Sequence, residues 1–128
     1  MIILGEVNQP QTASVRNYQE KEMFLELRQY TTHPSQRNAW VKFMEKVIIP
    51  FQVSKGMVIV GSFVGEQDEN LYVWIRRFES ERERERLYEA VYQSDEWVNN
   101  IAPKIPEMLD RDKIVVTRIE PTPASVIH

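Results

Sequence analysis

The 128-residue sequence contains no cysteine and only two histidines, His33 and His128. The lack of cysteine excludes disulfides, thiolate catalysis and cysteine-ligated metals, and it is compatible with a reducing compartment. His33 lies beside Pro34 and His128 is the last residue, so we expect no metal site and no cofactor. The four glycines are too scattered for a phosphate-binding loop, and no Gly-x-Ser-x-Gly nucleophile motif is present.

Long apolar runs and an excess of basic charge are also missing. No run reaches the ~18 apolar residues that suggest a membrane-spanning helix, and residues 1–4 are too short and lack the basic leader of a secretion signal. The formal net charge of −3 provides no electrostatic attraction to nucleic acid. We therefore expect a cytoplasmic protein with no membrane span and no nucleic-acid partner.

The composition that remains fits one globular domain, since 42% of the residues are hydrophobic. Residues 8–22 are rich in Gln, Asn, Ser and charge without a sustained period. Residues 1–22 are therefore predicted to be an N-terminal extension that is either flexible or packed on a partner. The domain is predicted over residues 23–121, and residues 122–128 are predicted to be an irregular tail.

Four segments have the pattern of β-strands: 24–31, 57–64, 71–78 and 113–120. Each shows period-two alternation or a β-branched centre. Helical patterns lie after the first strand and after the third, which makes the order strand, helix, strand, strand, helix, strand. This order predicts an α+β fold of the ferredoxin-like βαββαβ type, with one antiparallel sheet and both helices on a single face.

The first predicted helix follows Pro34 and Ser35. Its apolar residues from Trp40 to Phe51 recur at i, i+3, i+4 and i+7. Pro50 should kink or fray the last turn, and Gly56 should end the helix.

The second predicted helix opens with a capping box in which the Ser80 hydroxyl accepts from the Glu83 N–H and Glu83 reaches back. The alternating charges from Glu81 to Arg86 are interpreted as a solvated helix face. Ser94 begins a further short helix.

The two faces of the predicted sheet differ in chemistry. We assign the aliphatic residues of the third strand, Leu71, Val73 and Ile75, to the face under the helices. The uncovered face would then carry Tyr72, Trp74, Arg76 and Phe78, beside Glu26, Arg28 and Tyr30 of the first strand. Because monomers rarely expose such a patch, we predict a homodimer through the open sheet face. The alternative is that an arginine remains unpaired there and binds a ligand carboxylate or phosphate.

Several short motifs resemble the NIPSNAP family over residues 23–120. They are Glu26-Leu27-Arg28-Gln29-Tyr30-Thr31, Gly56, Val60-Gly61-Ser62-Phe63, Trp74-Ile75-Arg76-Arg77-Phe78, and Tyr92 followed by Ser94 and Trp97. The resemblance implies a ferredoxin-like subunit of the dimeric α/β-barrel superfamily. That superfamily includes cofactor-free monooxygenases, haem-degrading enzymes and stress-response proteins, so the fold does not determine the function. The family often has Pro-Gly before its first helix, where this chain has Pro34-Ser35.

Aromatic and arginine side chains are the candidates for a ligand pocket between helix and sheet. They are Arg28, Tyr30, Trp40, Trp74, Arg76 and Trp97. The favoured hypothesis is a dimeric domain that binds a small aromatic or anionic ligand or a protein partner. The alternative is a cofactor-independent enzyme, such as an oxygenase, that acts on a small aromatic or anionic substrate. No catalytic residue can be named from the sequence.

Overall fold

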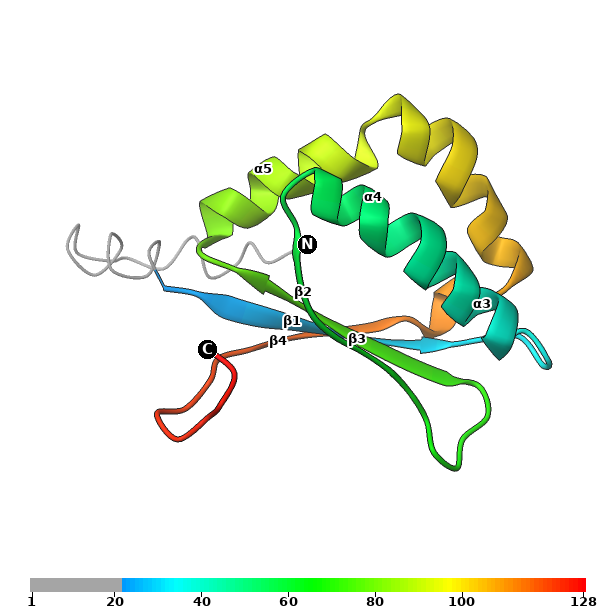
Figure 1. The fold of residues 1–128 in the computed structure, drawn as a ribbon, viewed down its shortest axis with the longest axis horizontal. Helices are drawn as coiled ribbons and strands as arrows, with labels where there is room; N and C mark the ends of the chain where they lie inside the picture. Colours follow the sequence, from blue (N-terminus) through cyan, green and yellow to red (C-terminus); the bar gives the residue numbers. More distant parts are fainter. Residues whose placement is uncertain (1–21) are drawn as a thin grey trace.

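A computed structural model describes residues 22–128, so the predicted extension lies outside the described residues except for Glu22. The strands are β1 (Phe24–Thr31), β2 (Val58–Val64), β3 (Leu71–Phe78) and β4 (Val115–Ile119). They form one antiparallel sheet in the order β2-β3-β1-β4, and the helices cover one face of it (Figure 1). This confirms the predicted ferredoxin-like fold.

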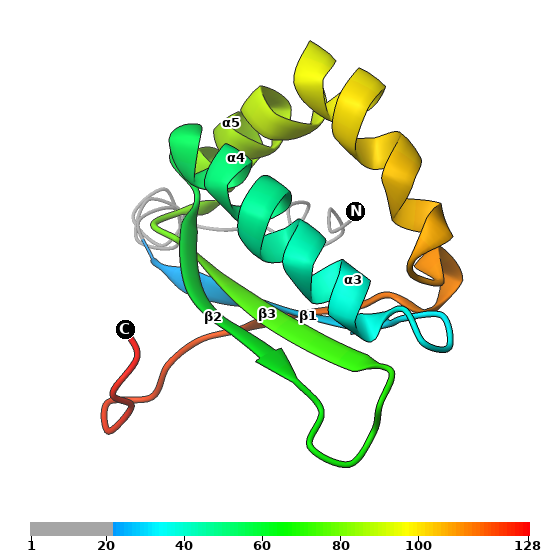
Figure 2. The same cartoon turned by 45° about the vertical axis from the view of Figure 1, so that its right-hand side comes forward.

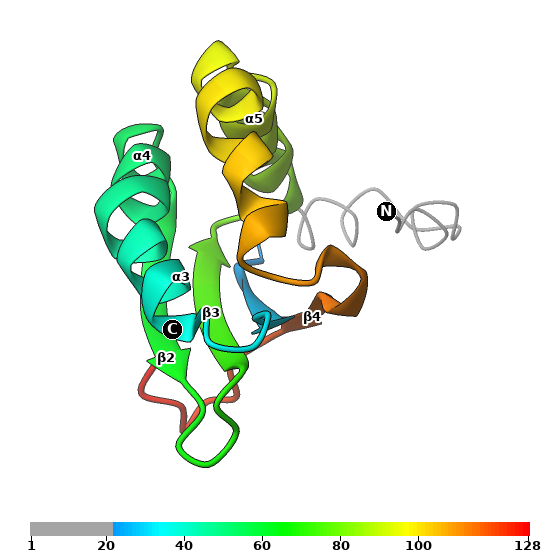
Figure 3. The ribbon, with the colours of Figure 1, turned by 90° about the vertical axis from the view of Figure 1, so that its right-hand side faces the viewer.

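Two helical segments make up the layer above the sheet. The first is α3 (Arg37–Phe43), the π-helical turn η1 (Met44–Ile48) and α4 (Ile49–Ser54). The second is α5 (Glu81–Tyr92), the π-helical turn η2 (Trp97–Ile101), and the 3-10 turns η3 (Ala102–Glu107) and η4 (Arg111–Lys113). Figures 2 and 3 show the two segments side by side, with the second arching down to the sheet. None of the helices within residues 22–128 is long and apolar enough to cross a membrane.

The helix ends differ in detail from the sequence predictions. Ser35 has φ 68° and forms a turn, so the first helix begins only at Arg37. Gly56, at φ 110°, follows the end of α4 as predicted. The Glu83 N–H donates to Ser80 Oγ at 3.1 Å, but the Glu83 carboxylate accepts from the Glu79 N–H instead of the Ser80 N–H. The Glu83 carboxylate therefore bonds to the N–H of the residue before the N-cap, Glu79, and not to the N–H of the N-cap itself.

The prediction of which residues face the helices is wrong. Tyr72, Trp74, Arg76 and Phe78 are at most 1% exposed and lie under the helical layer. The β1–β3 register pairs Glu26 with Arg76, Arg28 with Trp74 and Tyr30 with Tyr72, so these β1 residues share the covered face. Tyr72 and Trp74 pack there with Trp40 of the first helical segment, and Phe78 packs with Leu87 of the second.

The open face is therefore aliphatic rather than aromatic. Alternation puts Leu71, Val73 and Ile75 of β3 on it, and Leu27 is registered opposite Ile75. Phe63 of β2 is registered opposite Val73 and is 50% exposed. Val115 and Ile119 of β4 share this face and are also exposed. Among the described residues, only the C-terminal segment turns back on this side of the sheet, where Arg77 Nε donates to the His128 carbonyl (Figure 1).

Candidate functional site

A buried ionic network links the sheet to both helical segments. Arg76 is 0% exposed, and its Nε and Nη2 donate to one oxygen of Glu26 at 3.1 and 2.6 Å. Its Nη1 donates to Gln52 Oε1 and to the Tyr92 hydroxyl, each at 2.7 Å, and Nη2 also donates to the Tyr88 hydroxyl at 3.0 Å. Five oxygen contacts match the five N–H donors of a guanidinium, so Arg76 has no free donor for a ligand.

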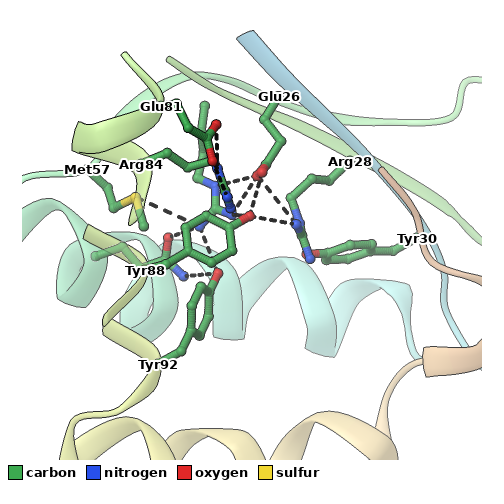
Figure 4. Close-up of polar contacts among 10 residues, drawn as sticks. Glu26, Arg28, Tyr30, Met57, Glu81, Arg84, Tyr88 and Tyr92 are labelled. Carbon is green, nitrogen blue, oxygen red and sulfur yellow. Dashed lines mark hydrogen bonds and ion pairs between the residues drawn. The ribbon is translucent and has the colours of Figure 1, made fainter. Parts of the chain in front are cut away.

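Arg28 contacts the same carboxylate oxygen of Glu26 as Arg76 does, and Figure 4 shows Arg28 between Glu26 and Tyr30. Its Nε donates to the Tyr30 hydroxyl at 2.7 Å, and its Nη1 lies 3.3 Å from Glu26 and 3.4 Å from the Tyr88 hydroxyl. Among the described residues no hydrogen bond involves its Nη2, and 15% of the side chain is exposed. Arg28 therefore keeps donor capacity that Arg76 has lost.

The protonation states of the network follow from burial and charge. Burial alone would raise the pKa of Glu26, but the charges of Arg76 and Arg28 outweigh it and hold the pKa below the ordinary value. Burial raises the pKa of Tyr88 to about 12 and also raises that of Tyr30. At neutral pH the network thus contains one carboxylate, two guanidinium groups and neutral phenols, a net charge of +1.

A cavity of about 120 Å³ adjoins this network between the sheet and the helical layer. Its lining is aromatic (Tyr30, Trp40, Trp74, Tyr92, Trp97), aliphatic (Met44, Ile48, Ile105, Leu109, Ile114) and cationic (Arg28, Arg111). None of these lining residues is His, Asp or Glu. All three tryptophans of the chain contribute to the wall.

The aromatic wall is held by ring-on-ring contacts. Tyr30 packs edge-to-face on Trp40 and Trp74 with centroids 5.8 and 6.3 Å apart, and Tyr92 packs edge-to-face on Trp97 at 4.8 Å. The Arg76 guanidinium carbon lies 4.8 Å from the centre of the Trp74 ring. The indole N–H groups of Trp40 and Trp74 are buried and have no hydrogen-bond partner among the described residues. The wall thus combines aromatic rings with two indole donors whose hydrogen-bonding capacity is unused.

Two π-helical turns supply part of the lining. In η1 the Ile49 N–H bonds to the Met44 carbonyl, and in η2 the Ala102 N–H bonds to the Trp97 carbonyl. A proline follows each closing residue, at positions 50 and 103. A proline ring clashes with the carbonyl four residues earlier, and widening the preceding turn is one way to relieve that clash. Pro50 therefore accompanies a π turn, and the helix continues to Ser54 without the predicted fray.

The structure brings together five of the six residues predicted as a candidate pocket. Arg28, Tyr30, Trp40, Trp74 and Trp97 line the cavity. The sixth, Arg76, lies neither in the cavity wall nor on the open face, because its partners from α4 and α5 enclose it. Whether these residues bind a ligand stays a prediction.

Arg111 is the charged lining residue that sequence reasoning missed. It lies in η4, which is attached to the end of β1 by the Asp110 N–H donating to the Thr31 carbonyl at 3.0 Å and by the bridge between Thr32 and Leu109. These contacts join residues about eighty positions apart. No local pattern around Arg111 could have indicated its place at the cavity.

Metal ligands are scarce in the described part of the chain. Residues 22–128 contain no group of three or more His, Cys, Asp or Glu side chains that could hold a metal ion. His33 Nε2 lies 2.9 Å from the Pro106 carbonyl, to which it donates, and His33 is not among the cavity residues. The chemistry available to the site is therefore that of arginine and aromatic rings.

The fold and much of the chain are similar to known proteins. The NIPSNAP family model matches residues 25–123. A NIPSNAP family protein of unknown function from Agrobacterium tumefaciens is 25% identical, with a TM-score of 0.76 over 84% of this chain and 96% of its own. An uncharacterised NIPSNAP-like domain protein from Burkholderia xenovorans is 21% identical, with a TM-score of 0.73 over 82% of this chain and 90% of its own. No curated protein matches the sequence. Since the family model spans well over half of the residues, the chain belongs to the NIPSNAP family.

Proposed function

We propose that this chain is a small-ligand-binding domain that works as a homodimer, with the cavity beside Arg28 as its site. One observation carries the proposal: the same cavity is lined by all three tryptophans and by Arg28, whose Nη2 has no hydrogen bond within residues 22–128. Pockets of this composition, mostly apolar with few polar groups, are the usual form of small-molecule sites. The ligand class is a small aromatic or anionic molecule.

The lining favours binding over acid–base catalysis. A general base must take a proton within hydrogen-bond reach, and the lining contains no carboxylate or imidazole. The Tyr30 hydroxyl already accepts from Arg28, and burial raises its pKa, which makes it a poor base at neutral pH. A cofactor-independent enzyme remains the alternative function.

The open sheet face supports the homodimer. It carries apolar side chains from all four strands, among them Phe63, Val73, Leu27 and Val115, which are interrupted by Gln29 and Thr117. No helix lies over it among the described residues (Figure 3). Contiguous apolar patches on a sheet are usually covered by a partner. A second copy covers it by symmetry, because the same face meets itself in an isologous interface.

Intrinsic tryptophan fluorescence tests the ligand site directly, because every tryptophan of the chain lines it. The full chain is titrated with a panel of small molecules: benzoate, benzamide, phenol, acetate and inorganic phosphate. We expect a saturable change in emission with at least one member, and a rise in melting temperature with the same compound.

Two variants test whether the change in tryptophan emission comes from a ligand bound in the cavity. Ile105→Phe fills the cavity and should abolish the change, whereas Val53→Phe, at an exposed position of α4, should leave it intact. No response to any compound, or an equal response from Ile105→Phe, would contradict the proposal.

A further inference from the structure

The charge around the cavity is unbalanced by one unit. Glu26 is the carboxylate of the network and is shared by Arg28 and Arg76. Arg76 is saturated by its contacts with Glu26, Gln52, Tyr88 and Tyr92. The excess positive charge is therefore centred on Arg28, whose Nη2 has no hydrogen bond among the described residues. Two guanidinium groups that share one carboxylate keep one unit of partly buried positive charge, and a bound anion would offset that charge.

The size of the cavity limits the ligand to a single ring. An apolar cavity of about 150 Å³ is known to hold benzene, and this cavity measures about 120 Å³ and has the solvent-exposed Arg111 in its lining. A six-membered ring or a smaller planar group fits this volume. A fused polycycle does not fit without displacing wall residues.

The wall selects a planar ligand. Tyr30, Trp40 and Trp74 are locked to one another by edge-to-face contacts, so the cavity cannot widen through the rotation of one ring. Flat molecules match such a wall by stacking or edge contacts, each worth a modest gain beyond area burial.

Arg28 is already oriented for a carboxylate. The Tyr30 hydroxyl, Glu26 and the Tyr88 hydroxyl hold the guanidinium through Nε and Nη1. Because its rotamer is fixed before binding, little side-chain entropy is lost when an anion binds. Glu26 and Tyr88 act here as positioning residues.

We infer that the cavity selects a small planar monocarboxylate, with its carboxylate on Arg28 and with Arg111 at the rim. This inference rests on the proposed ligand-binding function and names its ligand class. One excess buried charge matches a monoanion. A dianion such as a phosphate monoester would need a second buried cation, and Arg111 is exposed and screened by salt.

The test compares benzoate with benzamide, its neutral isostere, and with phenyl phosphate, using tryptophan fluorescence of the full chain. We expect benzoate to bind about tenfold more tightly than either, because of the three only the monoanion offsets one unit of excess positive charge without adding a second negative charge. Equal affinity for benzamide, or tighter binding of phenyl phosphate, would overturn the monocarboxylate while leaving the proposed function intact. No binding by any of the three would overturn both.

Variants of three arginines test what each side chain contributes to benzoate affinity. Arg28→Lys keeps the charge but removes the guanidinium whose Nε and Nη1 are held by Tyr30, Glu26 and Tyr88, and with it the Nη2 donor, so it should weaken benzoate about tenfold with little change for benzamide. Arg111→Met, an exposed position expected to fold normally, should weaken benzoate only about twofold to threefold and reduce its salt dependence. Arg86→Met, an exposed arginine on α5 away from the cavity, is the matched control and should change neither. Unchanged benzoate affinity in Arg28→Lys would overturn the assignment.

Discussion

A single carboxylate organises the buried polar residues of this domain. Glu26 accepts from Arg76 and Arg28 and also accepts a hydrogen bond from the Tyr88 hydroxyl, so one residue of β1 joins β3 and α5. Two guanidinium groups share it, which leaves Arg28 with the capacity to bind an anion. Removing the carboxylate would leave Arg76 as an uncompensated charge in the core, where burial allows no solvation.

Glu26→Gln should destabilise the protein by about 3 kcal/mol at neutral pH, the cost of breaking a buried ion pair. The arginines lower the folded-state pKa of Glu26 below its ordinary 4.5. Its contribution is therefore fully present above that value and is lost as pH falls through the folded pKa. Urea unfolding of the wild type and the variant should show a large difference in unfolding free energy at neutral pH. This difference should disappear at acidic pH, where Glu26 is protonated.

An exposed glutamate provides the control for that measurement. Glu66→Gln, in the loop after β2, should change the unfolding free energy by less than about 0.5 kcal/mol at either pH. A gap for Glu26→Gln that stayed constant down to strongly acidic pH would contradict the assigned ion pair.

At the scale of elements, the connection between β1 and α3 contains the chain's clearest backbone strain. Ser35 has φ 68°, a left-handed conformation that favours glycine, in a turn attached by the His33 N–H to the Met108 carbonyl at 2.9 Å. The same turn delays the start of α3 to Arg37 and so sets the position of Trp40 in the cavity wall. A glycine at position 35 would suit this conformation better than serine does.

Ser35→Gly should raise the unfolding free energy by about 0.5 kcal/mol. Relief of a left-handed non-glycine residue gains about 1–2 kcal/mol, and part of this is offset by the greater entropy of glycine in the unfolded chain. Ser35→Ala is the matched control, because alanine keeps the strained φ and should bring no gain. Chemical denaturation measures both; a stability of Ser35→Gly below that of Ser35→Ala would contradict the explanation.

On the scale of the whole molecule, the domain has one covered sheet face and one aliphatic open face. Helices α3 to α5 cover the first, where the cavity lies, while Val73 and Ile75 occupy the middle of the second (Figure 1). The two surfaces are separated by the sheet itself. Dimer formation and ligand binding can therefore be disturbed independently.

Val73→Glu should convert the proposed homodimer to a monomer, because it places a charge in the centre of the apolar interface. Light scattering should give twice the 15.2 kDa of one chain for the wild type and one chain for the variant. Val98→Glu, an exposed valine in η2 on the helical side, should leave the dimer unchanged. A wild-type monomer at micromolar concentration would refute the dimer.

The sequence by itself determined the segments of this fold. Period-two alternation predicted β1 and β3, β-branched runs predicted β2 and β4, and the apolar stripe from Trp40 to Phe51 predicted the first helix, because these signals are local. It also identified Trp40, Trp74 and Trp97 as candidates for a pocket. Period-two alternation separates the two faces of a strand, but it does not decide which face points into the core.

The tertiary structure alone decided the faces and the cavity. The charge of Arg76 argued for the surface, yet Glu26, Gln52, Tyr88 and Tyr92 enclose it from three other elements, and no window of sequence contains those partners together. Arg111 reaches the cavity through contacts between the end of β1 and a turn far along the chain. Burial of a charge depends on partners that only the folded chain brings together, which is why the sequence alone could not place Arg76 in the core.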